Sequence, residues 1–281
     1  MMGDDSVSTS LQAAYLLHYT EWQESSYIVD AFTLSHGRIS MMAKSARASR
    51  PQVRALYQPF RPLLLSWVGH SDMRTLTGIE ESGAAVPLAD AALACGYYIN
   101  ELVMRLLGKD QPQTEVFAHY MVALNDLGAL GEPGQPGMEA VLRLFELQLL
   151  DALAVLPDLA RCTPNGSPVL PDREYRYHPA NAIAIVQNPA LDVDSSLGIQ
   201  KEKTRMGEGD SRDPALHADG MTLDEGMLVS GRTLLALSSL DVDDPAVLQE
   251  ARGLMRRILR VHLGDRPLRS RELFDSLVRR N

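Results

Sequence analysis

The chain has 281 residues, which exceeds one small domain and suits two domains of about 150 residues each. Hydrophobic residues make up 45% of the sequence and charged residues 22%, which excludes an extended disordered protein and predicts that most of the chain folds. The formal net charge of -9 gives no overall attraction for a polyanion, so a nucleic-acid partner requires a local basic surface.

The first part of the chain predicts a small β-barrel. Its short segments are rich in β-branched, aromatic and aliphatic residues and are separated by turn signals such as Ser35-His36-Gly37. Their imperfect alternation of apolar and polar residues favours barrel strands, and five strands in about 80 residues most often form an OB-fold. The five predicted strands are Leu11 to Tyr19, Tyr27 to Leu34, Ile39 to Ala43, Leu63 to Val68 and Thr75 to Ile79.

Beyond Pro87 the apolar residues recur at the 3.6-residue period of helices. Asp244 and Pro245 form an N-cap followed by proline at the first helical position, and Gly264 marks the end of that helix. Helical or ordered segments are expected at Asp90 to Leu107, Thr114 to Leu127, Met138 to Leu156, Gly231 to Leu240, Asp244 to Leu263 and from Ser270 onward. The fold class is therefore α+β, with a five-stranded OB-fold barrel at residues 1–82 and an α-helical domain at residues 83–281.

Acidic residues are concentrated in the middle of the chain. Residues 1–80 carry seven Lys or Arg and seven Asp or Glu, whereas residues 81–251 carry eleven and twenty-six. Between Ala31 and Ser71 there is no Asp or Glu, although this stretch holds six cations. Phosphate contacts dominate nucleic-acid affinity, so this run favours nucleic-acid binding over a merely solvated face. The candidate contacts are Arg38, Lys44, Arg47, Arg50, Arg54 and Arg61.

Aromatic residues interleave with these cations, and an OB surface binds single strands by stacking bases on such rings. Phe32, Phe60 and Trp67 stand in apolar surroundings and are predicted to lie in the barrel core. Tyr57 is the one candidate stacking ring, with a core position as the alternative. The arginines between Arg252 and Arg280 offer either a second basic surface or a solvated helix face.

No sequence motif predicts catalysis. Phosphate-binding, dinucleotide-binding, nucleophile-elbow and zinc-protease motifs are absent, and the seven histidines lack ligand spacing, so we expect a protein that is not an enzyme. The two cysteines, Cys95 and Cys162, show no spacing for a bridge, which suits a reducing cytosol. The acidic start lacks the features of a secretory signal, and no apolar run approaches the roughly 18 residues of a membrane span, so we expect a cytoplasmic protein.

Motifs spread over nearly the whole chain resemble the RecO family of bacterial recombination mediators. Individually each motif is short, but their order and spacing agree with that family. They comprise Phe32-Thr33, Gly37-Arg38 and Ala43-Lys44-Ser45-Ala46-Arg47 within Glu24 to Arg47, then Leu56-Tyr57-Gln58-Pro59-Phe60, Tyr98-Ile99-Asn100-Glu101-Leu102, Arg143 to Leu150, and Arg269-Ser270-Arg271-Glu272-Leu273-Phe274.

The resemblance implies a nucleoid-associated protein without cofactors that binds single- and double-stranded DNA and anneals complementary strands. It also implies that, with RecR, the protein helps load the recombinase RecA onto DNA coated by single-strand-binding protein (SSB). We hypothesise that the basic barrel face holds the strand backbone, while the helical domain docks the acidic C-terminal tail of SSB. Arg143, together with Arg269 and Arg271, is the candidate for the tail carboxylates, because a guanidinium binds them bidentately. The alternative for Arg143 is a surface arginine paired with Glu146.

Many members of the RecO family carry four cysteines as a zinc site after the Phe-Glu-Leu helix. In this chain the corresponding segment, at about residues 157–182, is a degenerate zinc-finger-like segment. It contains Cys162, but the second pair of cysteines is missing, and only His178 is nearby as another candidate ligand. Two ligands cannot close a tetrahedral site, so we expect no metal. A polar stretch at about residues 187–220 predicts a flexible insertion, to which we assign no role.

Two other functions stay open at this point. A protein-interaction scaffold would use the basic run for an acidic partner, and a nuclease would require clustered carboxylates for metal ions, which the sequence does not indicate. Loss of DNA affinity with rising salt distinguishes DNA binding from the scaffold, and incubation of DNA with Mg²⁺ tests the nuclease. Oligomeric state, the path of DNA and the stoichiometry with RecR do not follow from the sequence.

Overall fold

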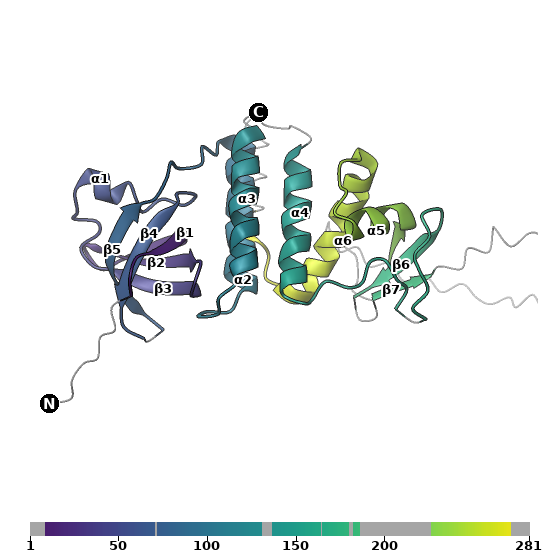
Figure 1. Cartoon of the computed structure of the whole chain (residues 1–281), viewed down its shortest axis with the longest axis horizontal. Helices are drawn as coiled ribbons and strands as arrows, with labels where there is room; N and C mark the ends of the chain where they lie inside the picture. The colour runs from purple at the N-terminus through teal and green to yellow at the C-terminus, as the bar shows by residue number, and fades with distance from the viewer. Residues whose placement is uncertain are drawn as a thin grey trace, which may run out of the picture. The chain divides into compact units, whose positions relative to one another are not determined.

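The computed structural model describes residues 9–70, 72–130, 137–163, 165–179, 182–185 and 226–270. The chain divides into two compact units (Figure 1). The first unit combines Met1–Leu156 with Leu240–Asn281, and the second is Pro157–Ser239. The domain boundary between residues 82 and 83 stays a prediction. The barrel and the helices after it belong to one compact unit, and compact packing does not show which part folds independently.

Five strands close into a barrel, as the sequence predicts for the N-terminal part. Around the barrel they follow the order β1-β2-β3-β5-β4, and β1 pairs with β4 to complete the circle. Neighbouring strands are antiparallel except β3 and β5, which run parallel. The strands are β1 (Gln12–Trp22), β2 (Ser26–Thr33), β3 (Gly37–Ala43), β4 (Leu63–Val68) and β5 (Arg74–Glu81).

The barrel core is built from alternate residues of the strands. In β4, buried Leu63, Leu65 and Trp67 alternate with half-buried neighbours, as expected for one face turned inward. Between β3 and β4 the chain forms a single helical turn, α1 (Pro51–Arg54), which the sequence pattern did not indicate. Proline at the first helical position favours this turn, because its missing N–H needs no partner there.

The helical part of the first unit buries one apolar stripe of each helix. Its elements are α2 (Asp90–Leu106), α3 (Thr114–Leu130), α4 (Gly137–Ala152) and α6 (Pro245–Leu263). The start of α6 agrees with the sequence prediction, since the Asp244 carboxylate accepts a hydrogen bond from the Ala246 N–H at 2.8 Å. Gly264, with φ 67°, follows its end. The helix expected from Ser270 onward lies beyond the described residues, which end at Ser270.

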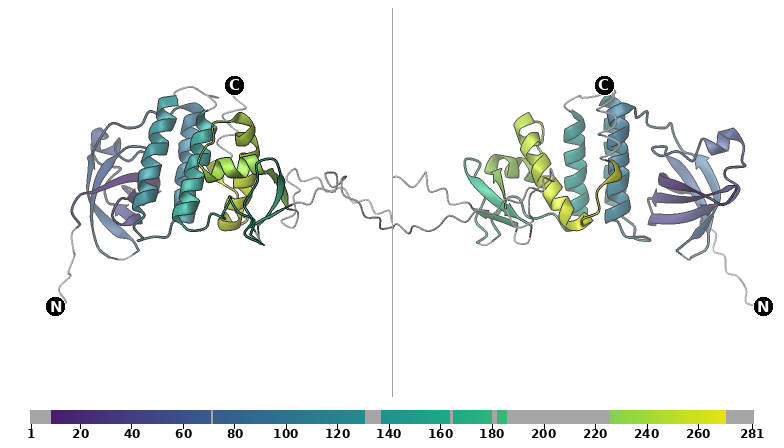
Figure 2. Two further views of the ribbon diagram at one scale, coloured as in Figure 1. Left: turned by 45° about the vertical axis from the view of Figure 1, so that its right-hand side comes forward. Right: turned by 180° about the vertical axis from the view of Figure 1, so that it is seen from behind.

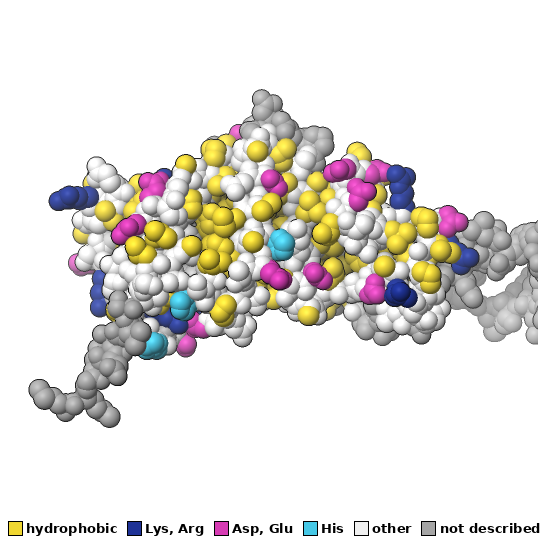
Figure 3. All heavy atoms as spheres, in the orientation of Figure 1, with side chains coloured by type: hydrophobic (Ala, Val, Ile, Leu, Met, Phe, Trp, Pro, Cys, Tyr) yellow, Lys and Arg dark blue, Asp and Glu magenta, His cyan; other side chains and the backbone are white. Residues whose placement is uncertain are grey.

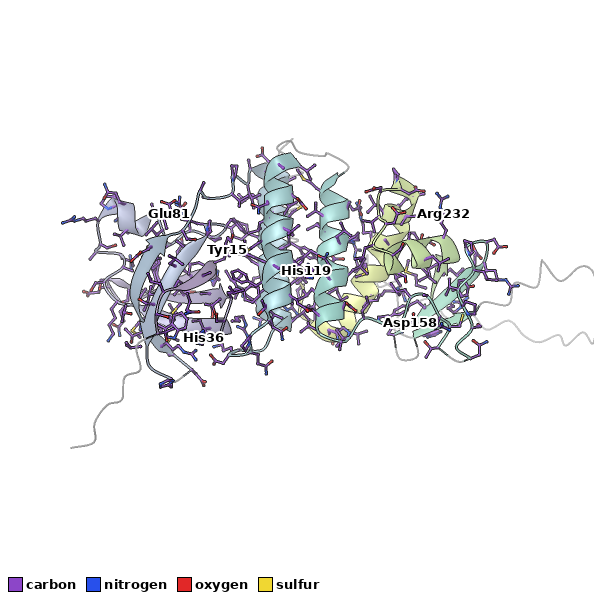
Figure 4. The ribbon with its side chains drawn as sticks, in the orientation of Figure 1. Tyr15, His36, Glu81, His119, Asp158 and Arg232 are labelled. Atoms are coloured by element: carbon purple, nitrogen blue, oxygen red, sulfur yellow. The ribbon has the colours of Figure 1, made fainter. Side chains whose placement is uncertain are left out.

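Aromatic rings join the barrel to the helices. Tyr15 of β1 and Phe32 of β2 contact Phe117 and Tyr120 of α3, with ring centroids 5.2 to 5.9 Å apart. Figure 4 shows Tyr15 between the barrel and the helices. Phe32 is therefore buried, but its ring lies in this interface rather than in the barrel core, where the sequence analysis placed it.

A second correction concerns Phe60. Its ring is buried against Tyr97 of α2, with centroids 5.2 Å apart, instead of filling the barrel. Trp67 does lie in the barrel core, at 2% exposure. Apolar composition thus predicted burial correctly, but it did not distinguish the core from the interface with the helices.

The described residues of the second unit form a small sheet and one helix. Its strands are β6 (Glu174–His178), β7 (Ala182–Ile185) and β8 (Met227–Ser230), in the order β7-β6-β8. Helix α5 (Gly231–Ser238) follows directly, and the Ser230 hydroxyl caps it by accepting from the Thr233 N–H. The sequence analysis assigned no strands here, because the strands are short and the surrounding residues are turn formers. The predicted insertion at about residues 187–220 lies outside the described residues.

Candidate nucleic-acid interface

The six cations of the acid-free run lie on β3, on the turn after it, at and on α1, and just before β4. They differ in what their side chains contact. Arg38 is half-buried on β3, and its Nε donates to the Leu107 carbonyl at 3.2 Å. Its own carbonyl accepts from the Asp110 N–H at 2.9 Å. Arg38 therefore ties the barrel to the connection between α2 and α3.

Arg47 and Arg61 are paired with acids from other strands. Arg47 Nη2 lies 3.2 Å from a carboxylate oxygen of Glu21 on β1, and Arg61 pairs with Glu81 at the end of β5. The run contains no acidic residue, but in the folded barrel two of its arginines lie beside carboxylates from other strands. These pairs reduce the charge that Arg47 and Arg61 present to a phosphate.

Lys44, Arg50 and Arg54 form the remaining group, here called the α1 cation cluster. All three are exposed, and within the described residues none of these side chains has a hydrogen-bond or ion-pair partner. Figure 3 shows a dark-blue side chain projecting from the α1 end of the barrel. Because no ion pair within the described residues neutralises them, these three cations are the ones of the run best placed to contact a phosphate.

Tyr57, the candidate stacking ring, is buried. Only 6% of it is exposed, and it belongs to the barrel core. Burial, with a smaller contribution from Tyr27, raises its pKa to about 12. A buried ring offers no face to a base, so the structure favours the core alternative for Tyr57.

Arg143 is also buried, on the inner face of α4. Its Nη2 donates to Glu146 Oε1 at 2.6 Å, and the Tyr98 hydroxyl of α2 donates to the same oxygen. The pair with Glu146 was the alternative to tail binding in the sequence-based prediction, which placed it on the surface. Instead the pair lies between α2 and α4, where Arg143 is 7% exposed, and its guanidinium is not presented to a tail peptide.

Arg269 has an exposed side chain next to the end of the described chain, and Arg271 lies outside the described residues. The backbone around Arg269 is held by Glu101 of α2. Its two carboxylate oxygens accept from the Arg269 N–H at 3.0 Å and from the Ser270 N–H and hydroxyl at 2.9 and 2.8 Å. Glu101 thus fixes this segment while the Arg269 side chain stays at the surface.

Helix α6 carries a second group of arginines. Arg252 is held by two hydrogen bonds to Glu139, at 2.7 and 2.6 Å, whereas Arg256 and Arg260 are exposed. Within the first unit, α1 and α6 lie on opposite sides of α2 and α4 in every view (Figures 1 and 2). Helices α2 and α4 therefore separate the arginines of α6 from the α1 cation cluster.

The sequence analysis missed an exposed aromatic group on the β1–β2 hairpin. Strand β1 continues past its predicted end at Tyr19 to Trp22, and all residues from His18 to Trp22 are exposed. Tyr19 and Trp22 are 38% and 44% exposed. The aromatic and β-branched residues Tyr19, Thr20 and Trp22 were an available signal for a longer strand.

Within the described residues, no group of three or more His, Cys, Asp or Glu side chains is arranged to hold a metal ion. Cys162 is buried in a tight turn, where its N–H donates to the Ser167 carbonyl and its carbonyl accepts from the Gly166 N–H, both at 2.8 Å. The described part of the chain also contains no helix that is long and apolar enough to span a membrane.

Comparison with protein families agrees with this architecture. A family model described as recombination protein O N terminal matches residues 7–83, and one described as recombination protein O C terminal matches residues 91–272. The chain belongs to the RecO family. The N-terminal RecO match covers the barrel, and the C-terminal RecO match covers the helices and the second unit.

Several bacterial proteins named DNA repair protein RecO are similar to this chain. It is 35% identical to the one from Haemophilus influenzae over 268 residues, which are 95% of this chain and 97% of the relative. Identity to the Alkalilimnicola ehrlichii protein is 39% over 273 residues, covering 96% and 92%. Identity to an Actinobacillus pleuropneumoniae protein is 34% over 266 residues, covering 94% of each.

The RecO-like motifs of α2 and α4 hold the first unit together. Tyr98 and Arg143 meet at Glu146, Glu101 caps the segment at Ser270, and Asn100 bonds to the barrel. The polar atoms of these residues face other elements rather than solvent, so these residues have a structural role.

Proposed function

We propose that this RecO-family chain is a DNA repair and recombination mediator that binds single- and double-stranded DNA through the barrel. The α1 cation cluster supplies the main phosphate contacts, and Arg38, Arg47 and Arg61 contribute less because each is engaged within the protein. Binding of this kind does not read sequence, since phosphates are the same at every position. It acts by holding strands rather than by turnover.

The observation that carries this proposal is the isolation of Lys44, Arg50 and Arg54 from every carboxylate among the described residues. A protein with net charge -9 attracts DNA only where a local positive field survives. Each cation that neutralises a phosphate releases counterions, which is the dominant source of non-specific affinity.

The test is binding of labelled single-stranded DNA at several salt concentrations. Replacing Lys44, Arg50 and Arg54 together by Gln should lower the affinity and reduce the slope of log affinity against log salt by about 2, at roughly 0.7 for each lost contact. Duplex DNA should show a similar loss. Because all three side chains are exposed, the variant should fold normally.

A matched control replaces three exposed arginines on and after α6 in the same unit, Arg256, Arg260 and Arg266, by Gln. It changes the net charge equally, so a general field effect would lower the affinity in both variants. An unchanged salt slope in the α1 cluster variant would contradict the proposal and leave an acidic protein as the better partner for this surface.

We further propose that the chain anneals strands and, with RecR, relieves SSB inhibition of RecA loading, with the SSB tail held by the helical part. Arg269 supports the tail proposal, because its exposed guanidinium has no side-chain partner among the described residues. Arg269→Ala, alone and with Arg271→Ala, should weaken binding of an SSB-tail peptide in a direct titration.

RecA filament formation on SSB-coated DNA, with and without RecR, tests the mediator role. Incubation of DNA with the protein and Mg²⁺ tests the absence of turnover, and the DNA should stay intact.

A further inference from the structure

The β1–β2 hairpin extends beyond the barrel and carries a row of tyrosines on one face. Along an antiparallel pair, Glu21 lies opposite Tyr27 and Tyr19 opposite Val29, so Tyr19 and Tyr27 are diagonal neighbours on the same face. Their ring centroids are 5.1 Å apart, in an edge-to-face arrangement. The row continues into the barrel from Tyr27 to Tyr57, at 5.4 Å.

One end of the tyrosine row is buried in the barrel core, and the other end is exposed to solvent. Tyr57 is buried in the barrel core, whereas Tyr19 is 38% exposed at the end of the row. The buried rings hold the orientation of Tyr19, so its exposed surface does not have to be ordered again when a flat ligand binds.

A second exposed tyrosine comes from α2, which packs against β1. Tyr97 is 36% exposed and rests on Phe60, with ring centroids 5.2 Å apart. Asn100 lies one helical turn along α2 from Tyr97, and its side chain donates to the Leu17 carbonyl of β1 at 2.9 Å. Leu17 precedes Tyr19 by two residues on β1. Partial burial and Tyr19 both raise the pKa of Tyr97. Two exposed tyrosines, each supported by another ring, therefore come from neighbouring parts of two packed elements.

Cations border this surface. Tyr27 lies opposite Ala43 in the β2–β3 pair, and Lys44 is the next residue along the chain. Arg47 reaches the hairpin itself, where its Nη1 donates to the Gln23 carbonyl at 3.2 Å. The phosphate-binding side of the barrel and the tyrosine row are therefore adjacent.

We propose that Tyr19 and Tyr97 form a stacking platform for the bases of an unpaired DNA strand whose phosphates lie on the α1 cation cluster. The platform rests on the proposed DNA binding and adds a preference for single strands. A duplex cannot use the platform without unstacking, because both faces of each base are already covered by its neighbours. Stacking tolerates every base, so the preference is for strand state and not for sequence.

The tyrosines give the platform a measurable signature. Tyr19→Ala and Tyr97→Ala should each weaken binding of a thymidine strand of about 15 nucleotides by roughly fivefold or more. Binding of a strand of the same length without bases, and of a duplex, should change by less than about twofold, because the phosphate contacts remain. Tyr19→Phe should bind the thymidine strand like the unaltered chain, since the ring is kept.

Trp22 provides a matched control on the same hairpin. It is at least as exposed as Tyr19, but strand alternation places it on the opposite face. Trp22→Ala should therefore leave all three probes unaffected. If Tyr19→Ala fails to fold, Tyr19→Leu keeps an apolar contact with Tyr27 and removes only the aromatic face.

The outcomes separate the platform from the binding surface beneath it. If the α1 cluster variant loses every probe but the tyrosine variants bind like the unaltered chain, the platform is overturned and the DNA-binding proposal stands. An equal loss of the thymidine strand, the strand without bases and the duplex in the tyrosine variants would overturn it too, because stacking acts only through bases. If the α1 cluster variant keeps its affinity, the binding surface itself fails.

Discussion

Ion pairs made between strands determine how strongly individual arginines of the barrel can act on a phosphate. Arg61 is held by Glu81, and Arg47 by Glu21, although each acid is at least 20 residues away along the chain. Such partly exposed pairs add little stability, about 0 to 1 kcal/mol, because water already solvates both charges. Their effect on a bound polyanion is larger, since each carboxylate repels a phosphate nearby.

Glu81→Gln should therefore raise the affinity for single-stranded DNA by about two- to fivefold at low salt, with the gain shrinking as salt rises. Fluorescence anisotropy with a labelled strand measures it. Glu80→Gln makes the same change in net charge next to this site, but within the described residues Glu80 forms no ion pair. Equal gains in the two variants would show that Arg61 is not the cation being released.

The pKa of the Cys95 thiol reports how strongly a single titrating group is buried. Desolvation raises its pKa from 9.0 to about 11, although the nearby Arg143 acts in the opposite direction. A raised folded-state pKa contributes stability that is complete below pH 9 and is lost as pH rises toward 11.

The unaltered chain should therefore lose roughly 1 kcal/mol more unfolding free energy between pH 8 and pH 10 than Cys95→Ala, measured by urea denaturation. The comparison between variants removes the contribution of other titrating groups. A thiol reagent should also leave Cys95 unmodified at pH 8 until the chain unfolds. Rapid reaction of Cys95 in the folded protein would contradict its burial.

At the scale of elements, the turn between β2 and β3 docks on the connection between α2 and α3. Gly37 adopts φ 67°, and a Cβ at this position would lie 1.8 Å from the Gln111 carbonyl oxygen. Arg74 of β5 adds an ion pair to Asp110 of the same connection, at 2.6 Å. The turn therefore requires glycine both for its backbone conformation and for close approach.

Gly37→Ala should lower the unfolding free energy by more than the roughly 1 to 2 kcal/mol that a positive φ alone costs an alanine. Gly69→Ala is the control, because Gly69 also has a positive φ, 95°, but nothing lies within 4 Å of its added Cβ. Urea denaturation of both variants measures the difference. Equal losses of unfolding free energy in the two variants would mean that the connection between α2 and α3 moves away from the added methyl group without an energetic cost.

At the scale of the first unit, Asn100 couples barrel and helices. Its Nδ2 donates to the Leu17 carbonyl at 2.9 Å, and its Oδ1 accepts from the Tyr120 hydroxyl at 2.7 Å. Both bonds are buried. Removing the amide leaves the Leu17 carbonyl and the Tyr120 hydroxyl without these contacts, which costs about 1 to 3 kcal/mol for each group left unsatisfied.

Asn100→Ala should therefore lower the unfolding free energy by about 2 to 6 kcal/mol and separate the unfolding of the barrel from that of the helices. The two tryptophans of the chain, Trp22 and Trp67, lie in the barrel, so their fluorescence reports barrel unfolding. Circular dichroism reports the helices. The signals should coincide in the unaltered chain and in Tyr120→Phe, which removes one bond only, and diverge in Asn100→Ala. Coincident transitions in all three would show that the joint does not depend on this amide.

The sequence by itself determined the local features of this protein. Apolar periodicity and turn residues located the five barrel strands and the four long helices of the first unit, α2, α3, α4 and α6, because strand and helix formation depend on residues a few positions apart. The ordered motifs also identified the RecO family, which the family models confirmed. The small sheet of the second unit escaped prediction, since β7 and β8 are four residues long and β8 pairs with β6 across a long segment of chain.

Only the tertiary structure decided which candidate residues reach the surface. Tyr57 and Arg143 are buried by elements distant in sequence, and Arg47 and Arg61 are paired with acids outside the acid-free run. Burial and ion pairing act through space, whereas composition counts residues along the chain. For that reason the run of six cations was visible in the sequence, but the α1 cation cluster and the neighbouring tyrosine row required the folded barrel.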